Sequence, residues 1–178
     1  MNYKTQKWKK VSQENVFQKY NTKIDKVVYR LPNEKEADFY IQQSSDVVCV
    51  LAMTADHQLI LAKQYRPGPN EILFELPGGA IEPKEEPSAA IERELLEETG
   101  YRGKFEFVTI CFDDAYSTRT RYCFVATECM KVADPETGEH EFVELELLPL
   151  NEFRKLLRSG KMTDVEVGYL GLDFLNLL

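Results

Sequence analysis

The pattern of apolar and polar positions predicts a series of strands in the middle of the chain. Residues 46–54 are almost continuously apolar, which is typical of a strand buried on both faces of a sheet. Runs that alternate or stay apolar predict further strands at 58–65, 103–112, 121–130 and 142–148. We therefore expect a sheet at the centre of the fold.

The first 44 residues show shorter runs with polar alternation. Segments 3–11, 24–31 and 37–43 predict strands, and Pro32 with Asn33 marks a turn between the last two. We interpret this region as a small N-terminal β extension, residues 1–44, that precedes a larger domain at residues 45–178.

Two helices are predicted near the C-terminus. Residues 151–159 have apolar side chains at helical spacing, and Asn151 is the expected N-cap. Residues 165–178 repeat this spacing, with Thr163 or Asp164 as the expected N-cap. Together with the strands, these helices are compatible with an α/β fold.

A third helix is predicted at residues 87–99, and three glutamates share one of its faces. Glu94, Glu97 and Glu98 are three and four residues apart, so at about 100° per residue their side chains form one stripe. Like charges four residues apart destabilise a helix by about 0.2–0.5 kcal/mol per pair. A divalent cation that prefers oxygen ligands would make the stripe favourable. The alternative is an acidic helix face in solvent.

Composition limits the classes of function. The chain has 178 residues, 43% of them apolar, which is enough for one sizeable core. Its net charge of −8 disfavours nucleic-acid binding. No apolar run reaches the ~18 residues of a membrane span, and the N-terminus lacks the apolar segment of a signal peptide, so we expect a cytoplasmic protein. The four cysteines form no CxxC pair and are expected to be reduced.

The residues around the acidic stripe carry a family resemblance. Gly79, Glu85 and the segment RELLEETGY at residues 93–101 are spaced as in the Nudix box, the signature of hydrolases that cleave nucleoside diphosphates linked to another moiety. Tyr101 departs from the family, which usually has an aliphatic residue there. The resemblance implies an α/β/α sandwich with a mixed sheet, preceded by the small N-terminal β extension.

Cleavage of a diphosphate explains the acidic stripe. A divalent metal neutralises phosphate oxygens and makes a bound water more acidic. We expect Glu94 and Glu98 to be the principal ligands of Mg²⁺, or of Mn²⁺, and Glu97 to serve a further metal or a bridging water. The family resemblance adds the Gly78 carbonyl as an extra ligand. Arg93, together with Glu85, is expected to orient the helix and its carboxylates.

The flanking segments KQYRPGP, EILFELPGG and HEFVEL resemble the ADP-ribose pyrophosphatase branch of the family. This resemblance implies that Arg66 contacts substrate phosphate and that Glu75 lies in the site. The alternative for Arg66 is a surface ion pair with Glu71. Arg119 and Arg121 could also meet phosphate, but cross-strand pairing with acids explains them equally well.

The same branch implies roles for residues near both ends of the domain. Its N-terminal extension builds a homodimer and carries an aromatic side chain that stacks on adenine, so Trp8 is a base-stacking candidate; the alternative is an aromatic that anchors an N-terminal hairpin. A glutamate before the last strand is the general base, which corresponds to Glu141, with Glu139 as the neighbouring alternative. Both glutamates could instead merely solvate a loop.

We therefore expect a metal-dependent hydrolase that cleaves ADP-ribose, or a related nucleoside diphosphate sugar, to a nucleoside monophosphate and a sugar phosphate. Its partners would be a small nucleotide and a second copy of the chain, with no nucleic acid and no membrane. Two alternatives stay open. One is a pyrophosphohydrolase for nucleoside triphosphates, including oxidised ones, and the other is a catalytically silent nucleotide-sensing module.

Overall fold

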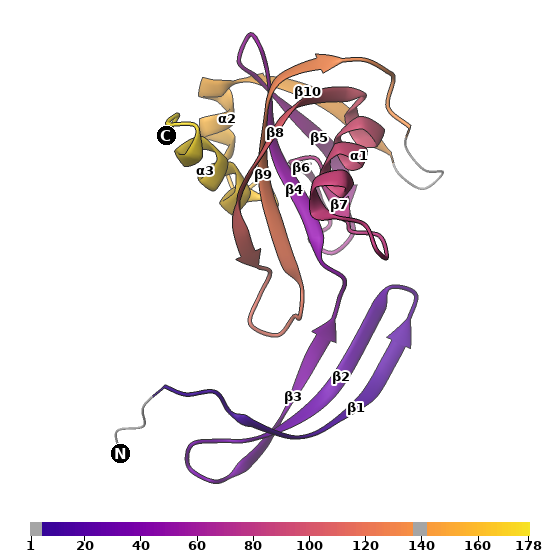
Figure 1. The fold of residues 1–178 in the computed structure, drawn as a ribbon, viewed down its shortest axis with the longest axis vertical. Helices are drawn as coiled ribbons and strands as arrows, with labels where there is room; N and C mark the ends of the chain where they lie inside the picture. The colour runs from indigo at the N-terminus through magenta and orange to yellow at the C-terminus, as the bar shows by residue number, and fades with distance from the viewer. Residues whose placement is uncertain (1–4, 137–141) are drawn as a thin grey trace. The chain divides into compact units, whose positions relative to one another are not determined.

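The computed structural model describes residues 5–136 and 142–178, which form two compact units (Figure 1). The first unit contains residues up to 45 and the segment 112–120, and the second contains 46–111 and 121–178. In the part of the chain described, no helix is long and apolar enough to cross a membrane.

The first unit is built on a three-stranded antiparallel sheet in the order β1-β2-β3. Its strands are β1 (Lys9–Lys19), β2 (Thr22–Arg30) and β3 (Glu36–Gln43). Every residue of β1 is exposed, and two irregularities in register interrupt its pairing with β2. Because β1 spans Lys9–Lys19, the strand expected at residues 3–11 is wrong in its extent. The polar residues of this exposed edge strand lack the one-sided alternation that marks a half-buried strand.

Segment 112–120 is hydrogen-bonded to the end of β3. Gln42 N–H donates to Tyr116 O at 2.8 Å, and Thr118 N–H donates to Gln42 O at 2.9 Å. The ring of Tyr116 stacks on Phe39, with 6.5 Å between centroids. The first unit is thus assembled from residues far apart in the sequence.

The second unit contains a seven-stranded sheet with the central order β10-β5-β4-β9-β8. β6 pairs with β5 and β7 pairs with β4. The strands are β4 (Val47–Thr54), β5 (Gln58–Arg66), β6 (Glu71–Glu75), β7 (Gly78–Ala80), β8 (Tyr101–Phe112), β9 (Thr120–Lys131) and β10 (Val143–Pro149). β4 is parallel to β9 and antiparallel to β5, so the sheet is mixed, as expected.

Three helices cover the two faces of this sheet (Figure 1): α1 (Pro87–Thr99), α2 (Leu150–Leu156) and α3 (Val165–Phe174). Alternate residues of β4 divide between two cores, because successive side chains of a strand point to opposite faces. Val48 and Val50 pack with α1, whereas Cys49 and Leu51 pack with α2 and α3. The expected α/β/α sandwich is therefore confirmed.

Two expected helix ends are wrong, and the expected N-cap of α3 is confirmed in its position alone. Asn151 is not the N-cap of α2, because the helix already begins at Leu150 and the Asn151 side chain accepts a hydrogen bond from Arg154. Asp164 has the N-cap position of α3, but its side chain makes no capping bond. α3 ends at Phe174 instead of 178, since Asn176 has a φ of 55°.

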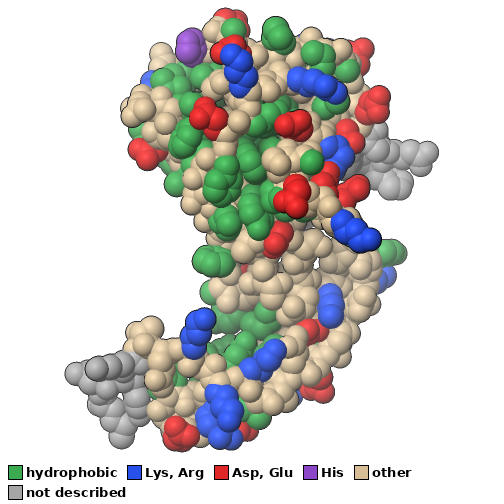
Figure 2. Space-filling model, in the orientation of Figure 1, with side chains coloured by type: hydrophobic (Ala, Val, Ile, Leu, Met, Phe, Trp, Pro, Cys, Tyr) green, Lys and Arg blue, Asp and Glu red, His purple; other side chains and the backbone are tan. Residues whose placement is uncertain are grey.

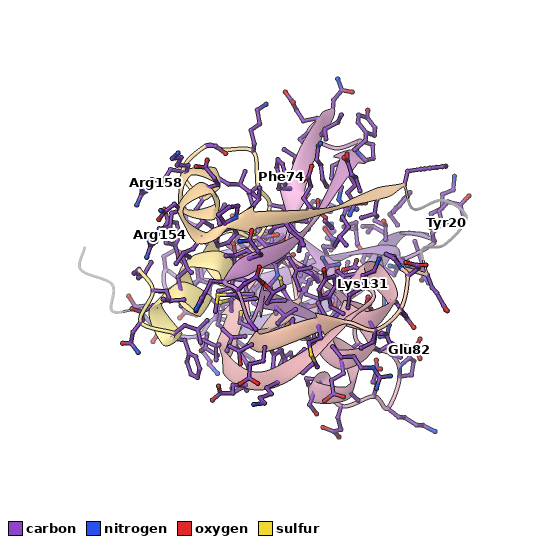
Figure 3. The ribbon with its side chains drawn as sticks, turned by 90° about the horizontal axis from the view of Figure 1, so that it is seen from above. Tyr20, Phe74, Glu82, Lys131, Arg154 and Arg158 are labelled. Carbon is purple, nitrogen blue, oxygen red and sulfur yellow. The ribbon has the colours of Figure 1, made fainter. Side chains whose placement is uncertain are left out.

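The C-terminal turn is fixed to α2. Arg154, labelled in Figure 3, donates from Nε and Nη2 to Leu177 O at 3.2 and 2.6 Å. Leu177 N–H in turn donates to Leu172 O at 2.7 Å. These bonds hold α3 against the same face of the sheet as α2.

We predict that Gly171→Ala destabilises the protein. A helical Gly→Ala change usually stabilises by about 1 kcal/mol, but a Cβ here would lie 2.7 Å from Cβ and Cδ2 of Leu51. Overpacking of this kind costs about 1–3 kcal/mol. The free energy of unfolding, measured in urea, should fall by that amount. Gly68→Ala is the control, because a Cβ there has no neighbour within 4 Å; an equal effect of the two substitutions would contradict the prediction.

Candidate active site

The acidic stripe of α1 lies against the turn that follows β6. Ala90, Ile91 and Leu95 are fully buried and fix the helix on the sheet. On the adjoining side, Gly78 N–H donates to Glu98 Oε2 at 2.9 Å. A side chain on Gly79 would collide with the Glu94 carboxylate. The two expected principal ligands, Glu94 and Glu98, thus both meet the glycine turn.

Gly78 itself lies against the backbone of β4. It is paired with Cys49 in the antiparallel ladder of β4 and β7. A Cβ at this position would overlap Val48 O and lie 2.8 Å from Cys49 Cα. A residue with any side chain would therefore push the turn away from the sheet and from α1.

Arg93 holds the acidic groups around it by several hydrogen bonds. It donates to Glu85 through Nε and Nη2, both at 2.9 Å, and to Glu94 and Glu97 through Nη1 at 2.8 and 3.2 Å. Nη2 also donates to Ala80 O at 3.1 Å. Arg93 thus links α1 to β7 and fixes two of the three stripe carboxylates.

These contacts shift the pKa values of the acids in opposite directions. The Arg93 hydrogen bonds lower the pKa of Glu85 to about 2. Burial raises the pKa of Glu94, and this effect exceeds the opposing effect of Arg93. Glu94 is thus a partly desolvated carboxylate, for which a neighbouring positive charge is favourable.

The donor set is suited to a hard divalent cation. Glu94, Glu98 and the Gly78 carbonyl offer oxygen atoms only, which Mg²⁺ and Mn²⁺ prefer. Within residues 5–136 and 142–178, no three acidic, His or Cys side chains are already grouped as a metal site. Glu94 and Glu97 instead bind Arg93, and Glu98 binds Gly78 N–H. The carboxylates would exchange these protein donors for the metal.

Arg66 and Glu75 form a fork-shaped ion pair between β5 and β6. Arg66 Nε donates to Glu75 Oε1 at 2.6 Å, and Nη2 contacts Oε2. Gln64 Nε2 also donates to Glu75 Oε2, at 3.0 Å. Glu75 is 6% exposed, so its charge requires these partners. The expected alternative partner, Glu71, is instead bound by Lys161 at 3.0 Å.

The neighbouring acids affect the pKa of Arg66. Its pKa is raised chiefly by the hydrogen bonds with Glu75, and the charges of Asp164 and Glu98 add to this effect. Its side chain is 46% exposed. Arg66 is therefore a cation that Glu75 holds in place and that remains accessible to solvent.

Arg121 and Arg119 are paired with acids, but in different units. Arg121 Nη1 lies 3.3 Å from Asp164 Oδ1 and also contacts Glu166, and both of these acids lie at the start of α3. Arg119 Nη1 lies 3.6 Å from Asp113 Oδ2, within the first unit. The role of Arg119 as a phosphate contact stays a prediction.

Trp8 packs inside the first unit. Its ring centroid lies 5.4 Å from that of Phe39 and 6.1 Å from that of Tyr29. The side chain remains 44% exposed. These contacts agree with an anchoring role, and base stacking stays a prediction. Glu139 and Glu141 lie outside the described residues.

Two contributors near the site were not expected from the sequence, namely Gln64 and Asp164. Gln64 lies in the polar segment that ends β5, and polar residues at the end of a strand are usually exposed to solvent. Asp164 precedes an apolar helical segment, a pattern that indicates an N-cap. Its actual contact with Leu76 N–H, at 3.3 Å, joins residues 88 positions apart. Sequence periodicity carries no signal for such a contact.

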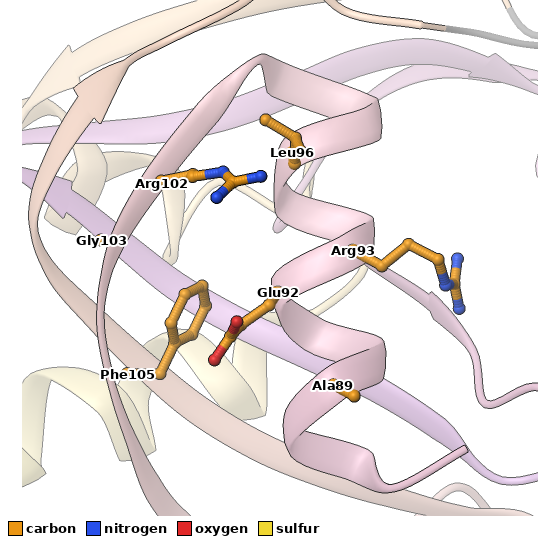
Figure 4. Close-up of a pocket in the computed structure, with 7 residues that line it drawn as sticks. All are labelled: Ala89, Glu92, Arg93, Leu96, Arg102, Gly103 and Phe105. Atoms are coloured by element: carbon orange, nitrogen blue, oxygen red, sulfur yellow. The ribbon is translucent and has the colours of Figure 1, made fainter. Parts of the chain in front are cut away.

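A pocket of about 450 Å³ lies between α1 and β8 (Figure 4). It is lined by Ala89, Glu92, Arg93 and Leu96 of α1 and by Arg102, Gly103 and Phe105 of β8. Glu94 and Glu98 are not among these residues. In Figure 4 the Arg93 side chain extends away from Glu92 and Phe105. The pocket thus lies on a different face of α1 from the acidic stripe.

Comparison with known proteins gives a consistent result. The family model described as NUDIX domain matches residues 43–166. The ADP-ribose pyrophosphatase of Bacillus subtilis (strain 168) is 31% identical over 150 residues, which are 83% of this chain and 80% of that protein. The ADP-sugar pyrophosphatase of Mus musculus is 38% identical over 114 residues, 60% of this chain; the match spans about half of the mouse protein, 52%.

The fold also matches a solved structure. A crystal structure of an ADP compounds hydrolase superposes with a TM-score of 0.82, covering 99% of this chain and 100% of the other. The two sequences are 19% identical. This likeness supports the α/β/α architecture.

We predict that Glu85→Gln changes how stability depends on pH. Because the folded pKa of Glu85 is lowered to about 2, its contribution is complete above the unfolded value of about 4.3 and is lost as the pH falls through the folded value. The wild-type free energy of unfolding should exceed that of the variant most at about pH 6, and the difference should shrink towards about pH 2. Urea unfolding at stepped pH measures this.

Glu92→Gln on the exposed part of the same helix is the matched control for Glu85→Gln. It removes one charge without touching the ion pair with Arg93. The prediction would be contradicted if the free energies of unfolding of wild type and Glu85→Gln differed by the same amount from neutral to acid pH. The ion pair of Glu85 with Arg93 would then not stabilise the fold.

Proposed function

Because the chain belongs to the Nudix family, we propose that it hydrolyses the diphosphate bond of ADP-ribose or a related nucleoside diphosphate sugar. The products are a nucleoside monophosphate and a sugar phosphate. One observation carries the proposal: Glu94 and Glu98 of α1 converge on the glycine turn at Gly78 and Gly79. The similarity to an ADP-ribose and an ADP-sugar pyrophosphatase supports this substrate class.

The reaction requires a cation as well as a nucleophile. The negative charges of a diphosphate repel an attacking oxygen, and Nudix enzymes generally need a divalent metal. When bound, such a metal neutralises phosphate charge and lowers the pKa of water. We propose Mg²⁺, with Mn²⁺ as an equally suitable ion, because every donor is an oxygen.

The residues of α1 and the glycine turn would hold this metal. Glu94, Glu98 and the Gly78 carbonyl supply the ligands, and Glu97 serves a further ion or a bridging water. Arg93 restricts the rotamers of Glu94 and Glu97 through its hydrogen bonds. The carboxylates are thus oriented before a ligand arrives.

Arg66 binds substrate phosphate in this proposal. Glu75 occupies its Nε and Nη2, which fixes the plane of the guanidinium group. The pair uses Nε and Nη2, and Nη1 donates to a phosphate oxygen. Trp8 stacks on the base, and Arg119 provides a second phosphate contact.

Glu141 is proposed as the general base that takes the proton from the attacking water, with Glu139 as the alternative. The sequence places both in an acidic stretch just before β10. Catalytic groups are often carried by such connecting segments.

The partner of the chain is a second copy. The first unit carries 10 Lys and Arg against 7 Asp and Glu, whereas the second carries 12 against 23. Lys and Arg side chains are visible on the first unit in Figure 2. The exposed strand β1 also presents Val11, Val16 and Phe17 to solvent. A basic, partly apolar unit and an acidic unit are complementary, which supports a homodimer.

A catalytically silent sensing module would bind nucleotide without needing the complete acidic stripe. Hydrolysis of nucleoside triphosphates uses the same stripe, but it does not explain the resemblance of the segments outside it. Both alternatives are decided by direct assay.

We predict that wild type with Mg²⁺ converts ADP-ribose to AMP and ribose 5-phosphate. The measurement is incubation with a panel of nucleotides and chromatography of the products. Removal of a residue that only orients a metal ligand usually costs about ten- to a hundredfold in activity. Glu98 is proposed as a ligand itself, so Glu98→Gln should lower turnover by at least this much. Its circular dichroism should match wild type. Turnover restricted to triphosphates would refute the substrate, and binding without turnover would favour the sensing module.

We predict that Glu141→Gln lowers kcat by about 10²–10⁴-fold, as expected for loss of a general base. The KM should change little, because the residue does not bind the ground state. Glu139→Gln is the matched control with the same charge change two positions away. A larger loss of kcat in the control would transfer the role to Glu139.

A further inference from the structure

The segment between α2 and α3 runs alongside β6. Phe74 N–H donates to Lys161 O at 2.9 Å, and Thr163 N–H donates to Phe74 O at 3.2 Å. Phe74, labelled in Figure 3, and Met162 form a parallel bridge. Met162 is 7% exposed and belongs to the core packed against α2 and α3. β6 is therefore bound to β5 on one edge and to this segment on the other.

Asp164 continues this pairing through its side chain. Leu76 N–H donates to Asp164 Oδ2 at 3.3 Å, and Thr163 Oγ1 donates to the same oxygen at 2.8 Å. Oδ1 lies 3.3 Å from Arg121 Nη1. The Asp164 side chain is 15% exposed. The carboxylate thus binds the connection after β6, and it makes no capping bond to α3.

Few backbone donors are available to hold the connection between β6 and β7. Pro77 has no N–H, so Leu76 and Gly78 provide the two donors of this connection. Gly78 N–H is bound by Glu98 of α1, and Leu76 N–H is bound by Asp164. The connection is therefore held from the α1 side and from the α3 side of the sheet. Pro77 O also accepts from Val50 N–H of β4 at 2.9 Å, so the middle of the connection is fixed to β4. Loss of Asp164 would release its first residue, Leu76.

We propose that Asp164, oriented by Arg121, is a positioning residue for the reaction at α1. By binding Leu76 N–H it sets the path of the backbone into the glycine turn. Together with the pairing of β7 with β4, this path determines where the Gly78 carbonyl lies. It also determines where β6 presents Glu75, the residue that holds Arg66. The inference rests on the proposed function, because it assumes that Gly78 contributes a ligand.

A purely structural role for Asp164 makes a different prediction. If the carboxylate only stabilised the start of α3, its removal would lower the thermal midpoint without changing the affinity of the folded protein for a cation. If it positions Gly78, cation affinity should weaken in the folded protein. Mn²⁺ binding followed by electron paramagnetic resonance, with no nucleotide present, separates the two.

The experiment compares three full-length variants with wild type. Asp164→Ala should raise the Mn²⁺ Kd and lower kcat by about ten- to a hundredfold, the usual effect of removing an outer partner of a metal ligand. Asp164→Asn keeps an oxygen that accepts from Leu76 N–H, so it should recover most of both losses. Glu166→Gln is the matched control, because Glu166 contacts Arg121, whereas Leu76 N–H donates to Asp164. It should retain wild-type values.

An unchanged Mn²⁺ Kd and kcat in folded Asp164→Ala would overturn the proposal, as would an equal loss in Glu166→Gln. If Asp164→Ala does not fold, Asp164→Asn is compared with Arg121→Gln. Asp164→Asn keeps the acceptor for Leu76 N–H, whereas Arg121→Gln removes the side chain that orients Asp164. A positioning role then requires weaker Mn²⁺ binding in Arg121→Gln than in Asp164→Asn. Should wild type act on nucleoside triphosphates alone, the substrate proposal fails, while the Mn²⁺ comparison still decides the role of Asp164.

Discussion

The close approach of the glycine turn to both β4 and α1 is the constraint on which the candidate site depends. Gly78 has no room for a side chain because the β4 backbone lies directly beside it, and Gly79 has none because of Glu94. This approach brings the turn against two helical carboxylates, since Gly78 N–H binds Glu98 and Gly79 lies beside Glu94. It is maintained by the buried residues of α1, which cannot move away from the sheet without opening a cavity.

Arginines keep the acidic groups of the second unit in fixed orientations. Arg93 binds Glu85 and two stripe glutamates, and Arg66 binds Glu75. The lowered pKa of Glu85 shows that Arg93 stabilises its ionised form, although desolvation offsets part of the attraction in partly buried pairs. Their main effect is to define geometry: each arginine fixes a carboxylate that would otherwise be repelled by its neighbours. The net charge of this unit makes that role necessary.

Elements with a strong hydrophobic period were predictable, and those without one were not. The apolar run of β4 and the helix α1 were expected at nearly their observed positions. β6 and β7 were not predicted, because strands of five and three residues beside proline and glycine carry no clear period. β1 was misplaced for a related reason, since an exposed strand needs no apolar face.

For the site, the sequence alone determined that Glu94, Glu97 and Glu98 share one helical stripe beside a glycine turn, since helical geometry is local. It also determined the family, because the box is contiguous. Only the tertiary structure decided which partner each charge takes. Arg66 binds Glu75 instead of Glu71, and Asp164 binds Leu76 N–H instead of capping α3. Those choices depend on contacts between distant segments, whose energies are set by burial and by the donors that packing leaves nearby.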